Sequence, residues 1–192
     1  MSLYKMSRWA IAAVAALCML APAQEDATPD EENTQQTTPK KKTPKNLKPV
    51  AAAIAAMDPF NSVPEFKAKY YIYLESASWC GPCCKEMPKI VELYQAMKKK
   101  KVDILLVGAD RSPEAAEAYL QKFKAEFPGV WGGDPLVKDL PGYKRSNFVP
   151  ACTIVDDKGK VITSGNASLI ERWEEILFKK KGGNKKGKSG SR

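Results

Sequence analysis

The sequence predicts an α/β fold, in which helices sandwich a mixed central β-sheet within a single domain. Two observations lead to this prediction. Along the middle of the chain, the hydrophobic periodicity switches repeatedly between that of strands and that of helices. Further on, two strand-like segments flank a hairpin-type turn, and an amphipathic helix follows. A length of 192 residues suits one compact domain with extensions.

The first half of the domain alternates between predicted helices and strands. Residues 50–57 are rich in alanine and predict a short helix. Residues 69–74 (KYYIYL) are aromatic and β-branched, which is typical of a strand. Residues 83–100 have apolar side chains at helical spacing and end in lysines, which favour a helix C-terminus. Residues 102–107 (VDILLV) predict a buried strand.

The second half begins with a further helix and closes with a hairpin and a last helix. A capping serine followed by proline opens a predicted helix over residues 112–127. Two predicted strands, 151–155 and 160–163, flank the turn sequence DDKG at 156–159. Apolar side chains at helical spacing then predict a closing amphipathic helix over 168–178.

Extensions of different character flank the predicted domain at 49–178. Residues 1–23 have a positively charged start, a short apolar run and small residues before a cleavage site, which predicts a signal peptide of bacterial type. An uncleaved amphipathic anchor is the alternative for this segment. Residues 24–48 are nearly devoid of large apolar side chains and predict a disordered linker. Residues 179–192 predict a basic disordered tail.

The formal net charge of +9 comes from the extensions, because residues 49–178 contain as many acids as bases. A neutral domain with basic tails argues against a nucleic-acid reader, whose basic patch would lie on the fold itself. We expect the tails to be solvated segments. Weak contact with an anionic envelope surface is the alternative. The signal peptide predicts export to the periplasm or cell envelope, an oxidising compartment.

Four of the five cysteines lie after the predicted cleavage site, and three of them crowd into residues 80–84. Bridges between such near neighbours close tiny loops and stabilise a fold little, so the cluster suits a reactive site better. The pair Cys80 and Cys83 could be half of a zinc site, but the chain has no histidine and no second CxxC. At a strand-to-helix junction, CxxC indicates redox chemistry. The helix N-terminus would lower the pKa of Cys80, and Cys83 can reach back to close a disulfide.

Around this pair the sequence resembles the thioredoxin superfamily. The similar motifs are WCGPC at 79–83, KEMP at 85–88, Val149-Pro150, and DDKGK at 156–160. The chain is most similar to the exported thioredoxin-like branch that includes the cytochrome c maturation reductases, over roughly residues 66–178. The resemblance implies a thioredoxin fold and a thiol–disulfide oxidoreductase that reduces disulfides of exported proteins. It would need no cofactor, and its partners would be protein disulfide substrates and an upstream dithiol donor. We expect a monomer.

The resemblance also implies a role for each matched residue. Cys80 would be the exposed nucleophile that attacks a substrate disulfide, and Cys83 the buried thiol that resolves the mixed disulfide. Pro150 would be cis, shaping a groove in which Val149 offers its backbone to the substrate. The expected substrate-binding residues are Trp79, Gly81, Pro82, Val149 and Pro150. A Gly-Pro pair between the cysteines is typical of reducing members.

The sequence departs from its relatives in the acid near the cysteines. Thioredoxins place a buried acid six residues before the first cysteine, where this chain has Leu74. Glu75 is adjacent, but strand alternation sends it to the other face. The exported branch has a glutamate three residues after the second cysteine, which corresponds to Glu86. Glu86 lies on the same helix side as Cys83, so we expect it to accept the Cys83 proton. The alternative is a surface carboxylate favoured by the helix dipole.

Two extra cysteines are a further departure. We expect Cys152 to be a buried free thiol and Cys84 a partly exposed one. The alternatives are a Cys84–Cys152 disulfide and a Cys152 thiol close enough to exchange with Cys83. Two other functions also remain open. The thiolates of Cys80, Cys83, Cys84 and Cys152 could bind Cu(I) or an iron–sulfur cluster, or the fold could serve as a redox-inert binding domain. If the protein is an oxidoreductase, no metal site is predicted.

Overall fold

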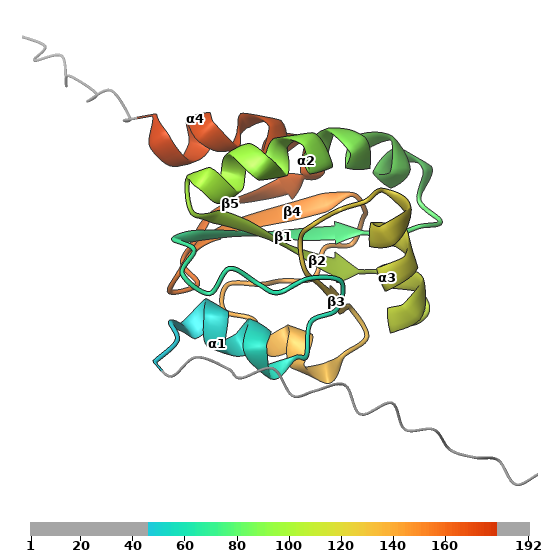
Figure 1. The fold of residues 1–192 in the computed structure, drawn as a ribbon, viewed down its shortest axis with the longest axis horizontal. Coiled ribbons are helices and arrows are strands. Elements are labelled where there is room, and N and C mark those ends of the chain that lie inside the picture. Colours follow the sequence, from blue (N-terminus) through green and yellow to red (C-terminus); the bar gives the residue numbers. More distant parts are fainter. Residues whose placement is uncertain (1–45, 180–192) are drawn as a thin grey trace, which may run out of the picture. The chain divides into compact units, whose positions relative to one another are not determined.

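The computed structural model describes residues 46–179, which are coloured in Figure 1. The predicted signal peptide at 1–23 lies outside the described residues, as do nearly all of the linker at 24–48 and of the tail at 179–192. These boundaries therefore stay predictions. Within the described part of the chain, no helix combines the length and the apolar character needed to cross a membrane.

Five strands form one mixed sheet in the order β3-β2-β1-β4-β5 (Figure 1). The strands are β1 (Tyr70–Ser76), β2 (Val102–Gly108), β3 (Gly129–Trp131), β4 (Ala151–Asp156) and β5 (Val161–Asn166). β1, β2 and β3 run parallel, whereas β4 is antiparallel to both β1 and β5. The predicted mixed sheet is confirmed.

Helices cover both faces of this sheet (Figure 1). One face carries α2 (Gly81–Lys99), α3 (Pro113–Lys122), the 3₁₀ helix η2 (Ala167–Arg172) and α4 (Trp173–Phe178). The other face carries α1 (Pro49–Ala56) and the 3₁₀ helix η1 (Pro135–Asp139). The predicted sandwich of helices around the sheet is confirmed.

The central strand β1 is buried on both faces, and its side chains alternate between two cores. Leu74 packs in the core beneath α2, whereas Tyr73 packs in the core beneath α1. α2 turns a single apolar face to the sheet, consisting of Met87, Ile90, Tyr94 and Met97. This packing fixes the start of α2 above the end of β1, which is where the cysteine pair lies.

A buried carboxylate on β2 ties three parts of the fold together. Asp103 is 1 % exposed. Its side chain accepts hydrogen bonds from the Tyr94 hydroxyl at 2.7 Å, the Glu65 backbone N–H at 2.7 Å and the Ile104 backbone N–H at 2.9 Å. Burial raises the pKa of Asp103, although these three donors oppose the shift. The network joins α2 and the segment before β1 to the sheet.

The helix predicted over 112–127 is shorter in the structure. Ser112 caps it as expected, since its hydroxyl accepts the Ala115 N–H at 3.2 Å. α3 ends at Lys122, however, and Lys124 takes a left-handed φ of 54°. Phe127 is fully buried in the core, so the chain leaves the helix to bring this ring inward.

Other differences concern short elements. The closing helix predicted over 168–178 is divided into η2 and α4. The structure also contains β3 and η1, neither of which was predicted. β3 has only three residues, too few to show a periodicity of their own.

Candidate active site

The loop after β1 places Cys80 at the N-cap of α2. Cys80 and Cys83 form a disulfide with their Cα atoms 5.2 Å apart. The Cys83 backbone N–H donates to the Cys80 Sγ at a distance of 3.3 Å. One of the unpaired N–H groups of the helix N-terminus is therefore directed at the Cys80 sulfur, where it would stabilise a thiolate after reduction.

Cys80 is less exposed than predicted. An exposed nucleophile was predicted, but Cys80 is only 6 % exposed, against 1 % for Cys83. Both pack in a small cluster with Ala77 and against Val149, and this packing covers the disulfide. Cys80 is still the more exposed of the two cysteines, which agrees with its predicted role as the residue that attacks the substrate first.

The loop before β4 approaches the disulfide from the side. The Val149–Pro150 peptide bond is cis, and the Val149 carbonyl oxygen lies 3.7 Å from the Cys80 Sγ. Trp79 projects into solvent with 66 % of its surface exposed, and Gly81 and Pro82 are exposed beside it. The structure thus brings the expected substrate-binding residues around one reactive sulfur.

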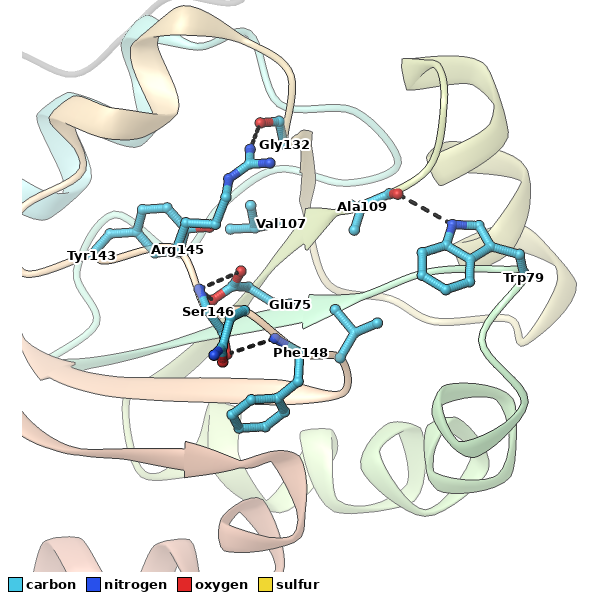
Figure 2. A pocket seen from close by; sticks show the side chains of 12 residues that line it. Glu75, Trp79, Val107, Ala109, Gly132, Tyr143, Arg145, Ser146 and Phe148 are labelled. Atoms are coloured by element: carbon cyan, nitrogen blue, oxygen red, sulfur yellow. Dashed lines mark hydrogen bonds between the residues drawn. The ribbon is translucent and has the colours of Figure 1, made fainter.

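A pocket of about 380 Å³ opens beside Trp79 and Val149. Figure 2 shows Trp79 at one end of this pocket, Tyr143 and Arg145 at the other, and Glu75 between them. The Trp79 indole N–H donates to the Ala109 carbonyl at 3.2 Å, which fixes the ring at the pocket edge.

Glu86 lies one turn along α2 from Cys83 and faces inward. Its Oε2 is buried and has no hydrogen-bond partner among residues 46–179. Burial and the nearby charge of Glu171 raise the pKa of Glu86. The Glu86 charge in turn contributes, after burial, to raising the pKa of Cys152 to about 12. Glu86 is therefore a partly buried carboxylate near the Cys152 thiol, and its role in proton transfer stays a prediction.

The two extra cysteines are free thiols, as predicted: Cys152 is buried and Cys84 is partly exposed. The Cys84 Sγ lies 3.4 Å from the Ser78 carbonyl oxygen, and the Cys152 Sγ lies 3.5 Å from that of Asn166. These thiols therefore point to different neighbours. In the described part of the chain, no group of three or more histidine, cysteine or acidic side chains is placed to hold a metal ion.

The sequence analysis missed a contact of Glu75. This side chain does face away from Leu74, as alternation predicted, but it is only 6 % exposed. Its carboxylate accepts the backbone N–H of Ser146, with nitrogen–oxygen distances of 2.9 and 3.1 Å. An acid at the end of an otherwise apolar strand was the available signal, because a buried carboxylate needs donors.

A family model described as "Thioredoxin-like" matches residues 68–161. That stretch contains both the cysteine pair and Val149-Pro150. The chain has a thioredoxin fold and is similar over this stretch to the thioredoxin superfamily. The similarity includes the CxxC helix N-terminus and the proline loop, which meet at one edge of this sheet.

Similar proteins in the superfamily have redox names. The thiol-disulfide oxidoreductase ResA of Bacillus thuringiensis subsp. konkukian (strain 97-27) is 31% identical over 117 residues, which are 60% of this chain and 65% of that protein. ResA of Oceanobacillus iheyensis (strain DSM 14371) is 34% identical over 103 residues, 53% of this chain and 52% of that protein. The chain thus spans less than two thirds of these relatives.

A solved structure is similar as well. The solution structure of a thiol:disulfide interchange protein from Bacteroides sp. is 26% identical, with a TM-score of 0.49. The match covers 65% of this chain and 81% of that one.

Proposed function

We propose that this protein is a thiol–disulfide oxidoreductase of the thioredoxin superfamily that reduces disulfides of exported proteins through Cys80 and Cys83. The observation that carries the proposal is the Cys83 N–H directed at the Cys80 sulfur, beside the Val149 carbonyl. The names of the ResA relatives support the same activity. The Gly-Pro pair between the cysteines favours the reducing direction, by its resemblance to reducing members.

The cycle begins with a reduced pair. The Cys80 thiolate attacks one sulfur of a substrate disulfide, whose S–S bond breaks and releases one substrate thiolate. The deprotonated Cys83 then attacks the Cys80 Sγ, which breaks the mixed disulfide and releases the second substrate thiolate. The Cys80–Cys83 disulfide is left behind. Two electrons and two protons have passed from the enzyme dithiol to the substrate.

Glu86 would supply the base in the second step. Cys83 must lose its proton before it attacks, and it is buried where water has little access. The buried Oε2 of Glu86 has no partner among the described residues, and burial raises its pKa, so it can take up a proton and release it again.

The extra thiols have no step in this cycle. A pKa raised to about 12 keeps Cys152 protonated at neutral pH, and a thiol is a poor nucleophile compared with a thiolate. Cys84 contacts Ser78 rather than the disulfide. The separate contacts of these two thiols give no support to the metal-binding alternative.

We further propose that the protein works in the periplasm or cell envelope, and that an upstream dithiol donor regenerates Cys80 and Cys83. The signal-peptide pattern of residues 1–23 supports export. The lysines near both ends of the chain could attract it weakly to anionic envelope surfaces.

The test is reduction of insulin by the protein in the presence of dithiothreitol. The wild type should accelerate reduction, and Cys80→Ser should abolish the acceleration because the attacking sulfur is lost. Cys83→Ser should accumulate a mixed disulfide with the substrate, visible by non-reducing electrophoresis, because nothing resolves it. Full turnover by Cys80→Ser would refute the proposal. Metal analysis of protein purified without chelator tests the alternative in the same preparation.

A further inference from the structure

Residues 144–149 carry Val149 to the disulfide without belonging to a helix or strand. Within the described chain, their backbone makes no hydrogen bond to other backbone groups. A segment of this kind would ordinarily be mobile, because nothing offsets its conformational entropy. Its position beside Cys80 must therefore come from side-chain contacts.

The first of these contacts comes from Glu75 on β1. Both oxygens of the Glu75 carboxylate lie within hydrogen-bonding distance of the Ser146 backbone nitrogen, at 2.9 and 3.1 Å. Figure 2 shows this bond crossing from the strand to the loop. A hydrogen bond to an ionised carboxylate is about twice as strong as one between neutral groups.

A second bond extends this contact toward the reactive sulfur. The Ser146 Oγ accepts the Phe148 backbone N–H at 3.3 Å (Figure 2). Phe148 is bonded to Val149, whose carbonyl oxygen lies 3.7 Å from the Cys80 Sγ. On the far side, the Arg145 guanidinium donates to the Gly132 carbonyl. Two short links thus connect the central strand to the residue next to the disulfide.

Packing alone would not place an acid at this position. The rest of β1 from Tyr71 to Leu74 is fully buried and apolar or aromatic. Burial raises the pKa of Glu75, and the Ser146 N–H, the Tyr143 hydroxyl and Arg145 only partly oppose that shift. Since a buried carboxylate destabilises a fold unless donors satisfy it, the donor it meets is informative. Here that donor belongs to the substrate-facing loop.

We propose that Glu75 is a positioning residue for substrate binding: it holds the segment from Ser146 to Val149 so that the Val149 backbone is presented to the substrate peptide beside Cys80. The inference rests on the proposed reductase function. It assigns Glu75 no proton transfer and no contact with the reacting sulfurs.

The test compares Glu75→Leu and Glu75→Gln with the wild type on two disulfides. Insulin is a peptide that would bind along Val149, whereas a small aromatic disulfide needs only access to Cys80. Glu75→Leu should raise the KM for insulin about tenfold, the loss of one hydrogen bond to a charged group, with a smaller effect on kcat. Glu75→Gln keeps an acceptor oxygen and should recover most of this loss. In Glu75→Leu, the rate of reduction of the small disulfide should change by a smaller factor than the KM for insulin.

Asp103→Asn is the matched control. It alters another buried carboxylate that accepts a backbone N–H, but its contacts lie at Tyr94 and Glu65, away from the pocket. It should reduce stability and leave the insulin KM unchanged. An equal KM change in Asp103→Asn and Glu75→Leu would mean general loosening and would overturn the proposal.

A pH profile keeps the proposal testable if Glu75→Leu does not fold. The insulin KM of the wild type should rise on acidification as Glu75 takes up a proton and becomes a weaker acceptor, whereas Glu75→Gln should lack this component. Tyr143 and Arg145 face Glu75, and Tyr143 stays neutral because burial raises its pKa. Identical KM profiles for the two proteins would overturn the proposal. A wild type that reduces neither disulfide would instead overturn the reductase function, and the positioning role with it.

Discussion

The Cys83 N–H directed at the Cys80 sulfur shows how one residue gains reactivity from its position in the chain. The N-cap of a helix faces unpaired N–H groups, and an anionic sulfur there is stabilised. The sequence predicted this placement from CxxC following a strand. It did not predict how far Val149 covers Cys80, because this contact comes from a loop 69 residues further along the chain.

Replacing Glu86 tests proton transfer at the residue scale. Glu86→Gln should slow release of the mixed disulfide at neutral pH, because Cys83 then lacks its base. The difference from wild type should shrink at high pH, where Cys83 ionises unaided, and at low pH, where Glu86 is itself protonated. Stopped-flow measurement of the release step across pH checks this. Since burial raises the pKa of Glu86, its charge is disfavoured in the fold, and Glu86→Gln should not lose stability at neutral pH.

A rate that is the same for Glu86→Gln and wild type at every pH would make Glu86 a bystander. The raised pKa would then record only its burial beside Glu171.

Thiol counting tests the assignment of the extra cysteines. The oxidised protein, cleaved after residue 23 and unfolded, should have two free thiols, Cys84 and Cys152, and peptide mapping should place its disulfide at Cys80–Cys83. The reason is geometric, since the Cys84 sulfur contacts the Ser78 carbonyl before α2, whereas the Cys152 sulfur contacts the Asn166 carbonyl at the end of β5. A count of zero in the oxidised monomer would reveal a second intramolecular bridge.

Among the elements, periodicity predicted the long ones and failed at the short ones. α2 was predicted over 83–100 and spans Gly81–Lys99, and the prediction is close because its apolar residues recur at helical spacing from Cys83 to Met97. α3 was predicted too long, because Phe127 is apolar at helical spacing yet reaches the core through a turn. Only the tertiary structure distinguishes those two ways to bury a ring.

The Asp103 network should stabilise the packing of α2 on β2. Asp103→Asn should lower the free energy of unfolding by about 2 kcal/mol at neutral pH, because one amide oxygen cannot accept all three donors and its NH₂ group faces N–H groups. Urea unfolding at several pH values measures this.

The pH dependence has a definite sign. Burial raises the pKa of Asp103 above its unfolded value, so its contribution is full below the unfolded pKa and is lost as pH rises through the folded pKa. The stability difference between wild type and Asp103→Asn should therefore widen on acidification. A difference that narrows would mean that the three donors, not burial, dominate the shift.

For the whole molecule, the sequence predicted the order of the longer strands and helices and the region of the candidate site, but neither β3 nor η1. It could not place residues 144–149, because their position depends on Glu75, on β1, and on Gly132, in the turn after β3. The sequence also could not predict that Glu86, on α2, lies close enough to Cys152, on β4, to raise the pKa of its thiol. Long-range contacts of polar side chains have no periodic signal.

The stability of the whole fold depends on whether Cys80 and Cys83 are oxidised or reduced. If the protein is a reductase, its fold favours the Cys80–Cys83 disulfide over the dithiol, whereas the fold of a strong oxidant stabilises the reduced form. Here both cysteines are nearly buried in an apolar cluster, so the cost of burying a thiolate opposes the stabilisation that the Cys83 N–H gives the Cys80 sulfur and favours the neutral disulfide. We expect the oxidised protein to unfold at a higher urea concentration than the reduced protein, by a free energy on the order of a few kcal/mol, since about 30 mV of potential corresponds to about 1.4 kcal/mol. Cys80→Ser should unfold at the same concentration with and without dithiothreitol. A reduced form more stable than the oxidised one would reverse the proposed direction and make the protein a disulfide donor.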